Sequence, residues 1–156
     1  MKWSELLDNW SLSSLSLTTG FLNMEWQPNE KDKQCAWELY VELLTSIATQ
    51  PLEDNHGDEL AALKNIYSLF QTTRSILKTD GRHCKEFTKI SVIVLNQVVR
   101  PFTAKWHKLT SSCELSSELC QEFRVDLDEL QKILINYTSL LADMAGVEDL
   151  TRMEED

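Results

Sequence analysis

The chain has 156 residues and a formal net charge of −10; 42% of the residues are hydrophobic and 26% are charged. This composition is typical of a globular domain, and no run approaches the roughly 18 apolar residues that cross a bilayer, so we expect no membrane-spanning helix. The N-terminal residues lack the long apolar core of a signal peptide, so we expect a cytoplasmic protein.

Residues 11–27, SLSSLSLTTGFLNMEWQ, alternate apolar and polar side chains on both sides of a glycine. Period-two patterning around Gly20 predicts a β-hairpin over about 11–27. A lone hairpin is only marginally stable, so we expect it to lie against the helices or against another protein.

The first helix is predicted at about 30–49, with Asn29 as its N-cap and Pro51 after its end. Its apolar residues recur at helical spacing, so they share one face that is expected to be buried. These residues are Ala36, Trp37, Tyr40, Val41, Leu44, Ile47 and Ala48.

A second helix is predicted at about 58–79, where leucines and aromatic residues form one stripe and Gly81 follows the end. A third helix, at about 84–99, is apolar nearly all the way round, so we expect other helices to surround it. Pro101 disfavours helical geometry at Arg100, which predicts a break or kink there and a new helical segment over about 101–109.

The last helix, at about 117–145, has the clearest pattern. Its apolar positions step by three and four residues from Cys120 to Met144, and Gly146 ends it. Residues 147–156 form an acidic tail that is expected to be mobile. The elements predict a mainly α fold, with a single helical domain over 1–146 that is a four- to five-helix bundle with an N-terminal β-hairpin.

Charge is unevenly distributed along the chain. Residues 1–60 hold three basic and eleven acidic residues. Residues 61–110 hold nine basic and two acidic residues, and residues 111–156 hold three basic and twelve acidic residues. Two interpretations of this basic middle are open. The basic helices either lie beside the acidic ones, or they form a positive patch that meets a phosphate backbone or an acidic partner.

Most catalytic templates are absent: there is no phosphate-binding loop, dinucleotide fingerprint or zinc-protease motif. We therefore expect no metal site and no cofactor. The oxygen-rich residues 53–59 lack the spacing of a calcium loop and are expected to form a solvated loop. The cysteines show no CxxC spacing and are expected to be free, mostly buried thiols. They are Cys35, Cys84, Cys113 and Cys120.

The best candidate for a site is the stretch RPFTAKWH at residues 100–107. Arg100 and His107 are about two helical turns apart, so in a helix they point to one side. Histidine can move a proton near neutral pH, and arginine can stabilise the charge that develops on a phosphate, so the pair can in principle cleave RNA. The residues expected to hold the nucleic acid are Lys89, Lys105, Lys108 and Trp106. A structural interpretation stays open, in which the aromatic side chains pack on the bundle.

The arginine, the following histidine and the preceding apolar helix resemble the active-site motif of the HEPN superfamily. That resemblance implies a small helical protein, often a dimer and often a metal-independent ribonuclease, with Arg100 and His107 as catalytic residues. Pro101 departs from the motif, where this residue is usually polar. Residues 36–52 and 94–109 also resemble stretches of uncharacterised small bacterial proteins, which implies a bacterial source. The HEPN resemblance adds the setting of toxin, CRISPR and anti-phage systems.

Two functions fit these observations. The favoured one is a non-enzymatic helical subunit that binds another protein, encoded nearby, in a bacterial multi-protein system such as anti-phage defence; a homodimer is also compatible. Its expected interface residues are Trp3, Trp10 and Trp26, since exposed tryptophan suits an interface, unless these rings pack into the bundle. The alternative is a HEPN-type ribonuclease, the only interpretation that requires RNA. The absence of a strong catalytic motif and the acidic ends of the chain favour the first.

Overall fold

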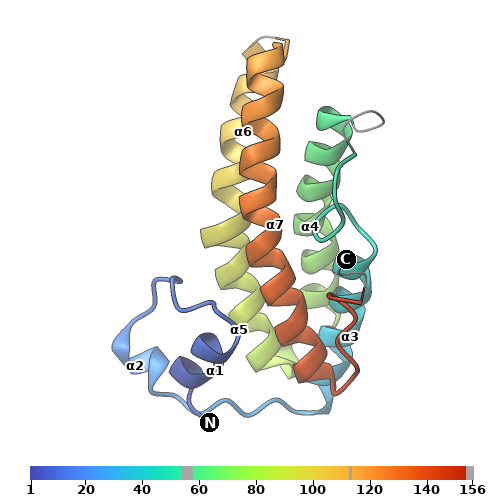
Figure 1. Ribbon diagram of the computed structural model, residues 1–156. Helices are drawn as coiled ribbons and strands as arrows, with labels where there is room; N and C mark the ends of the chain where they lie inside the picture. Colours follow the sequence, from blue (N-terminus) through green and yellow to red (C-terminus); the bar gives the residue numbers. More distant parts are fainter. Residues whose placement is uncertain (54–57, 113, 154–156) are drawn as a thin grey trace.

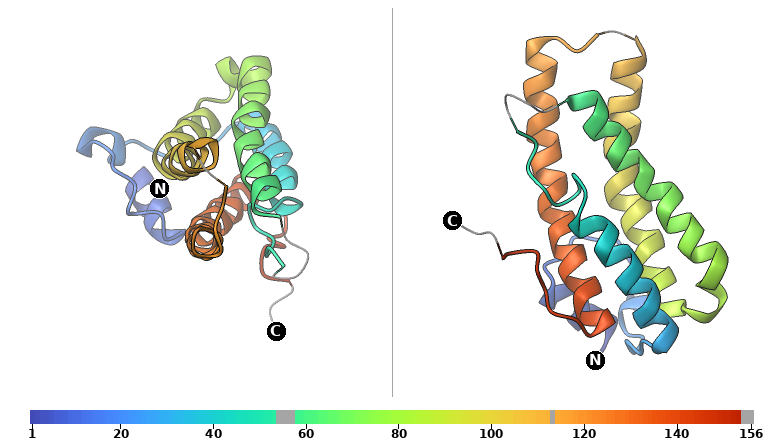
Figure 2. Two further views of the ribbon diagram at one scale, coloured as in Figure 1. Left: turned by 90° about the horizontal axis from the view of Figure 1, so that it is seen from above. Right: turned by 90° about the vertical axis from the view of Figure 1, so that its right-hand side faces the viewer.

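The computed structural model describes residues 1–53, 58–112 and 114–153 (Figure 1). The chain is mainly helical, as predicted. Its body contains α3 (Glu30–Leu44), α4 (Glu59–Asp80), α7 (Ser117–Ala145) and one continuous rod of α5 (Lys85–Val94), η2 (Leu95–Val99) and α6 (Arg100–Ser112). The short 3₁₀ turn η1 (Gly81–His83) joins α4 to α5. These elements lie side by side around a shared apolar core, as the view from above shows (Figure 2).

The N-terminal region holds two short helices, α1 (Trp3–Asn9) and α2 (Thr19–Leu22), so the predicted hairpin is wrong. In the part of the chain that the structure describes, β pairing is limited to an isolated bridge near the N-terminus. Leu12 and Leu15, three positions apart, are both buried in the core, which a two-residue period does not produce. Thr18 caps α2 with its side chain and so favours a helical turn where the second strand was expected.

α3 begins where the sequence predicts, because Asn29 and Asp32 form a capping box in which each side chain accepts a hydrogen bond from the other's backbone N–H. The helix ends at Leu44, earlier than the predicted end at residue 49. Beyond it, the side chains of Thr49 and Gln50 donate to carbonyls of the last turn at 2.8 and 3.0 Å. Because these side chains donate hydrogen bonds to backbone carbonyls that are free at the helix end, the chain can leave the helix there.

α4 and α7 match their predicted bounds closely. Asp58 and Ser116 cap their N-termini by accepting hydrogen bonds from backbone N–H groups of the first turn. Gly146 ends α7 with a φ of 72°, a left-handed conformation that favours glycine. The buried stripe of α7 includes Phe123, Leu127, Leu130, Leu134, Tyr137, Leu141 and Met144, as its spacing predicts.

Pro101 does not interrupt the rod, so the predicted break at Arg100 is wrong. Arg100 has helical dihedral angles, with φ −59° and ψ −44°, and α6 runs on to Ser112. The π-helical turn η2 immediately precedes it. Proline cannot donate a hydrogen bond to the carbonyl four residues earlier and its ring crowds that carbonyl, and a wider turn at this point lets the helix continue.

Residues 147–153, which were expected to be mobile, return along the bundle beside α3 (Figure 1). The Tyr40 hydroxyl donates to the Glu148 carbonyl and accepts from the Leu150 N–H, both at 3.0 Å. The hydroxyls of Ser139 and Thr151 lie 3.0 Å apart. These bonds fix the segment to α3 and α7; residues 154–156 of the predicted tail lie outside the described residues.

Candidate functional site

Arg100 lies on the side of α6 that faces α4. Its guanidinium carbon is 4.9 Å from the centroid of the Phe70 ring. Its Nε and Nη2 donate to the Asn96 side-chain oxygen at 3.2 and 3.0 Å. A neutral amide and an aromatic ring therefore hold Arg100 in place, and both leave its positive charge uncompensated.

His107 lies further along the same side of α6. Its ring approaches Tyr67 edge-on, with centroids 6.0 Å apart, and Tyr67 in turn contacts Phe70. Arg100 and His107 are both exposed, but the described contacts include none between their side chains. About 10 Å of helix rise separates the two positions, so they meet neighbouring rings of α4 and not one another.

A second arginine belongs to this region. The guanidinium carbon of Arg74, on α4, lies 5.7 Å from the Phe70 centroid. A pocket of about 260 Å³ opens here between α4 and α6. It is lined by Tyr67, Phe70, Gln71, Arg74, Arg100, Thr103 and Ala104, and this lining has no acidic side chain. Sequence reasoning missed Arg74 because only helix packing brings it to Arg100.

Two lysines that were expected to hold nucleic acid are engaged by carboxylates. Lys89 Nζ lies 3.0 Å from Glu86 Oε1. Lys105 Nζ lies 2.6 Å from Asp126 and 2.9 Å from Glu122, both on α7. Hydrogen bonds to Asp126 and then Glu122 raise the pKa of Lys105. The ammonium groups of Lys89 and Lys105 are therefore held in intramolecular ion pairs.

Trp106, expected to stack on a base, is fully buried against Phe123, with ring centroids 5.1 Å apart. Its indole N–H donates to Asp126 at 3.1 Å. Trp106 is therefore a core residue, as in the structural interpretation of this stretch. Lys108 is exposed on α6 and remains available to solvent.

The terminal tryptophans pack within the molecule. Trp3 is fully buried, with its ring centroid 4.9 Å from that of Phe21 and 4.8 Å from that of Trp26. Trp10 and Trp26 are half-buried against the core. Trp3 therefore stabilises the N-terminal segment, while parts of the other two rings reach the surface.

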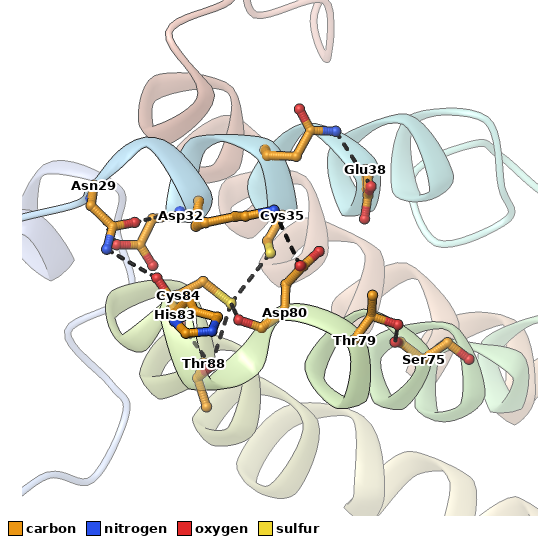
Figure 3. Close-up of polar contacts among 12 residues, drawn as sticks. Asn29, Asp32, Cys35, Glu38, Ser75, Thr79, Asp80, His83, Cys84 and Thr88 are labelled. Atoms are coloured by element: carbon orange, nitrogen blue, oxygen red, sulfur yellow. Dashed lines mark hydrogen bonds and ion pairs between the residues drawn. The ribbon is translucent and has the colours of Figure 1, made fainter.

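A buried polar cluster joins the start of α3 to the start of α5 (Figure 3). Asp32 is 1% exposed and accepts hydrogen bonds from the backbone N–H groups of Asn29 and Phe87 at 2.8 and 2.9 Å. Cys35 and Cys84 are buried free thiols with sulfur atoms 3.2 Å apart. Burial, together with the neighbouring Cys84, raises the pKa of Cys35 far above its usual range, which favours the protonated thiol.

The structure pairs part of the basic middle with acidic side chains and leaves part of it unpaired; whether it meets a phosphate or an acidic partner stays a prediction. Lys105, in the basic middle, pairs with Asp126 at 2.6 Å and with Glu122 at 2.9 Å, both in the acidic C-terminal segment. However, residues 60–79 and 87–112 contain no aspartate or glutamate. The pocket between α4 and α6 lies within these two ranges, so positive charge is left unopposed there.

An exposed apolar surface lies where α3 meets the C-terminal residues. Trp37 and Val41 are one turn apart on α3 and are 44% and 39% exposed. Tyr40 contacts the Trp37 ring and is hydrogen-bonded to the returning chain. A pocket of about 530 Å³ lies between the end of α3 and that chain. We name as the α3–tail surface the residues Trp37, Val41, Leu44, Leu150 and Met153.

The sequence analysis placed Trp37 and Val41 on a face that was expected to be buried. The structure buries Ala36, Tyr40 and Ala48 of that face, as predicted, but leaves Trp37 and Val41 partly open. The buried stripe extends instead to Leu39 and Leu43. The sequence does carry a sign of this exposure. The apolar residues of α3 spread over a wider face than the neighbouring elements cover, so some of them stay exposed.

No family model, curated protein or solved structure matches this chain. The resemblances noted above therefore rest on the sequence stretches alone. Among the described residues, none of the helices is long and apolar enough to span a membrane. Within the same residues, no group of three or more histidine, cysteine, aspartate or glutamate side chains is placed to hold a metal ion. Cys113 and residues 54–57 of the oxygen-rich loop lie outside the described part.

Proposed function

We propose that this protein is a non-enzymatic interaction subunit that binds a basic, amphipathic helix of a partner protein on the α3–tail surface. The observation that carries the proposal is the exposure of Trp37 and Val41 beside the pocket between α3 and the C-terminal residues. Burial of apolar area is the main favourable contribution to protein association, and tryptophan is enriched among the residues that dominate binding.

The shape of this surface supports a helical partner. Trp37, Val41 and Leu44 are spaced by four and three residues and so form one ridge along α3. The pocket lies at the end of that ridge, where Leu44 meets Leu150 and Met153. A partner helix with apolar residues at the same spacing can lie along the ridge and place one side chain in the pocket.

The charge around the surface supports a basic partner. Exposed carboxylates flank the apolar residues in the sequence of both segments: Glu38, Glu42, Glu148 and Asp149. Arg152, beside Asp149, offsets part of this charge. The remaining negative charge favours lysine and arginine along the edges of the partner helix and speeds its approach.

We extend the proposal to a bacterial multi-protein system, such as one for anti-phage defence, with the partner encoded nearby. This extension is supported by the sequence resemblances alone.

The test uses a labelled synthetic peptide in which leucines repeat every three to four residues between lysines, with binding followed by fluorescence anisotropy. Val41→Lys and Val125→Lys form a matched pair, because both valines are exposed on long helices and both variants add one positive charge. We expect Val41→Lys to weaken binding by about tenfold or more, and Val125→Lys to leave it nearly unchanged.

A peptide of the same composition with scrambled order is the second control. It keeps the charge and loses the apolar stripe, so it should bind much more weakly. If both peptides bind equally, or if both variants weaken binding equally, the attraction is non-specific and the proposed surface is wrong.

Cleavage of RNA is a second candidate function, favoured by one observation: Arg100 and His107 are exposed on the same side of α6. Its test is a cleavage assay without added metal, comparing wild type with Arg100→Ala, His107→Ala and the distant control Lys132→Ala. Loss of cleavage in the first two folded variants alone would support this function. No cleavage of several RNAs by the wild type, at concentrations that favour dimers, would exclude it.

A further inference from the structure

The surface between α4 and α6 carries positive charge that its surroundings do not neutralise. Arg74 from α4 and Arg100 from α6 approach the same ring, that of Phe70. Among the described contacts neither guanidinium has a carboxylate partner, and Arg100 bonds the neutral Asn96 oxygen. Two guanidinium groups held near the same ring repel each other, and a bound anion would offset that repulsion.

This arrangement differs from the other basic contacts between helices. Lys31 of α3 is paired with Asp80 at the end of α4, and Lys105 of α6 is paired with two carboxylates of α7. The packing of the bundle therefore neutralises the charges of those contacts, whereas Arg74 and Arg100 stay unopposed beside a pocket. That difference points to a ligand that supplies the missing negative charge.

We infer that Arg74 and Arg100 bind a phosphate group in this pocket and that the ligand is a nucleotide unit. The planar guanidinium group donates two parallel hydrogen bonds, which match the oxygens of a phosphate. Cation–π contact with Phe70 orients the two groups without consuming their charge. The phosphate is thus recognised by charge and by directed hydrogen bonds.

The size and lining of the pocket place the base outside it. Its volume of about 260 Å³ is below the roughly 300–1,000 Å³ of pockets that enclose drug-sized ligands, so it suits a phosphate and a sugar. Tyr67, at the edge of the pocket, is 45% exposed and packs against Phe70. Its ring offers a surface on which the base can stack.

This inference is independent of the α3–tail surface, which lies on other elements. It also requires no reaction: Arg74 is outside the Arg100–His107 motif, and a phosphate can be bound without being cleaved. His107→Ala is accordingly expected to retain phosphate binding even if it were to abolish cleavage.

Calorimetric titration of the full chain tests the inference with two probes, AMP and a short oligouridylate. We expect saturable binding that Arg74→Gln and Arg100→Gln each weaken by about tenfold or more. Arg82→Gln is the matched control, because Arg82 is exposed in η1, outside the pocket lining, and the variant removes the same charge. It should change the affinity less than twofold. Thermal melting checks that each variant is folded. If Arg100→Gln is destabilised, the inference is judged on Arg74→Gln, because Arg74 is exposed and its replacement should not affect folding.

The two probes separate the sources of the phosphate. Tighter binding of oligouridylate than of AMP would identify a phosphate within an RNA strand, and the reverse would identify a free nucleotide. Equal weakening by all three glutamine variants would show a general charge effect and overturn the inference. So would the absence of saturable binding of both probes at millimolar concentration.

The position of the base has its own test. Tyr67→Leu is expected to weaken the binding of AMP severalfold and to leave the binding of inorganic pyrophosphate unchanged. An equal effect of Tyr67→Leu on AMP and pyrophosphate binding would show that Tyr67 does not contact the base.

Discussion

The guanidinium carbon of Arg100 lies 4.9 Å from the centroid of the Phe70 ring. This contact joins α6 to α4 and orients the arginine through the negative face of the ring. Since the partner is aromatic, the charge of Arg100 is positioned but not neutralised. The most distinctive surface of the bundle, between α4 and α6, depends on this relationship.

A double-mutant cycle measures the strength of this contact. Phe70→Leu and Arg100→Met together should destabilise the protein less than the sum of the two single variants, with a coupling of about 0.5–1 kcal/mol. Urea unfolding of the four proteins gives the free energies. The pair Phe70→Leu and Arg82→Met should be additive; equal coupling in that pair would mean that the effect is not a direct contact.

Trp106 should behave as a core residue. Trp106→Ala is expected to lower the free energy of unfolding by about 3–5 kcal/mol, because it empties a buried site and leaves Asp126 without the indole donor. Trp37→Ala, at a partly exposed ring on α3, should cost about 1 kcal/mol. Equal losses in urea unfolding would contradict the assigned burial.

Asp32 should be a major stabilising residue, because its buried carboxylate accepts backbone hydrogen bonds at the start of both α3 and α5. Asp32→Ala is expected to lower the free energy of unfolding by about 3 kcal/mol, since two charged hydrogen bonds are lost. Glu30→Ala, an exposed change in the same helical turn, is the control and should cost less than about 0.5 kcal/mol. A loss for Asp32→Ala as small as that of the control would show that these bonds do not stabilise the fold.

The returning C-terminal residues should detach in acid. Partial burial acts to raise the pKa of Asp149, but hydrogen bonds from the Thr151 backbone and hydroxyl, with Ser139 and Arg152, lower it overall. A lowered pKa in the folded state stabilises the docked segment above the ordinary pKa of about 4, and this contribution is lost as the pH falls through the folded-state value.

Hydrogen exchange measures this detachment locally. Protection of the Leu150 amide, which donates to Tyr40, should fall below about pH 4 in the wild type. Asp149→Asn should reduce protection at neutral pH and remove most of the pH dependence. The control Asp128→Asn, at an exposed position on α7, should follow the wild type. A wild-type profile that persists in Asp149→Asn would assign the effect to another group.

Most helices could be predicted because their signals are local. Asp58, Ser116 and Gly146 mark the ends of α4 and α7, and the three-and-four stepping of α7 marks its buried stripe. The hairpin prediction failed because tertiary contacts override a short alternation: Leu12 and Leu15 are buried in the shared core, and the Ser16 backbone is hydrogen-bonded to the Gln97 side chain. The break at Pro101 failed because a π-helical turn accommodates the proline, and the sequence pattern contains no sign of that turn.

The candidate sites divide in the same way. The side of α6 shared by Arg100 and His107 follows from helical spacing, but the partners of each residue do not. Arg74 comes from another helix, and Trp106 is turned into the core by packing against Phe123. Contacts between residues far apart in the chain determine both the position of Arg74 beside the pocket and the burial of Trp106.

By itself, the sequence determined the helical class, the start of α3, both ends of α4 and α7, and the uneven distribution of charge, because caps, periodicity and composition act over a few residues. The tertiary structure alone decided which charges are opposed. It paired Lys105 with α7 and left Arg74 and Arg100 beside the Phe70 ring and one pocket, with no carboxylate in the lining. It also left Trp37 and Val41 open to solvent. The physical reason is that burial and electrostatic pairing depend on which surfaces meet, and that is settled only when the helices pack.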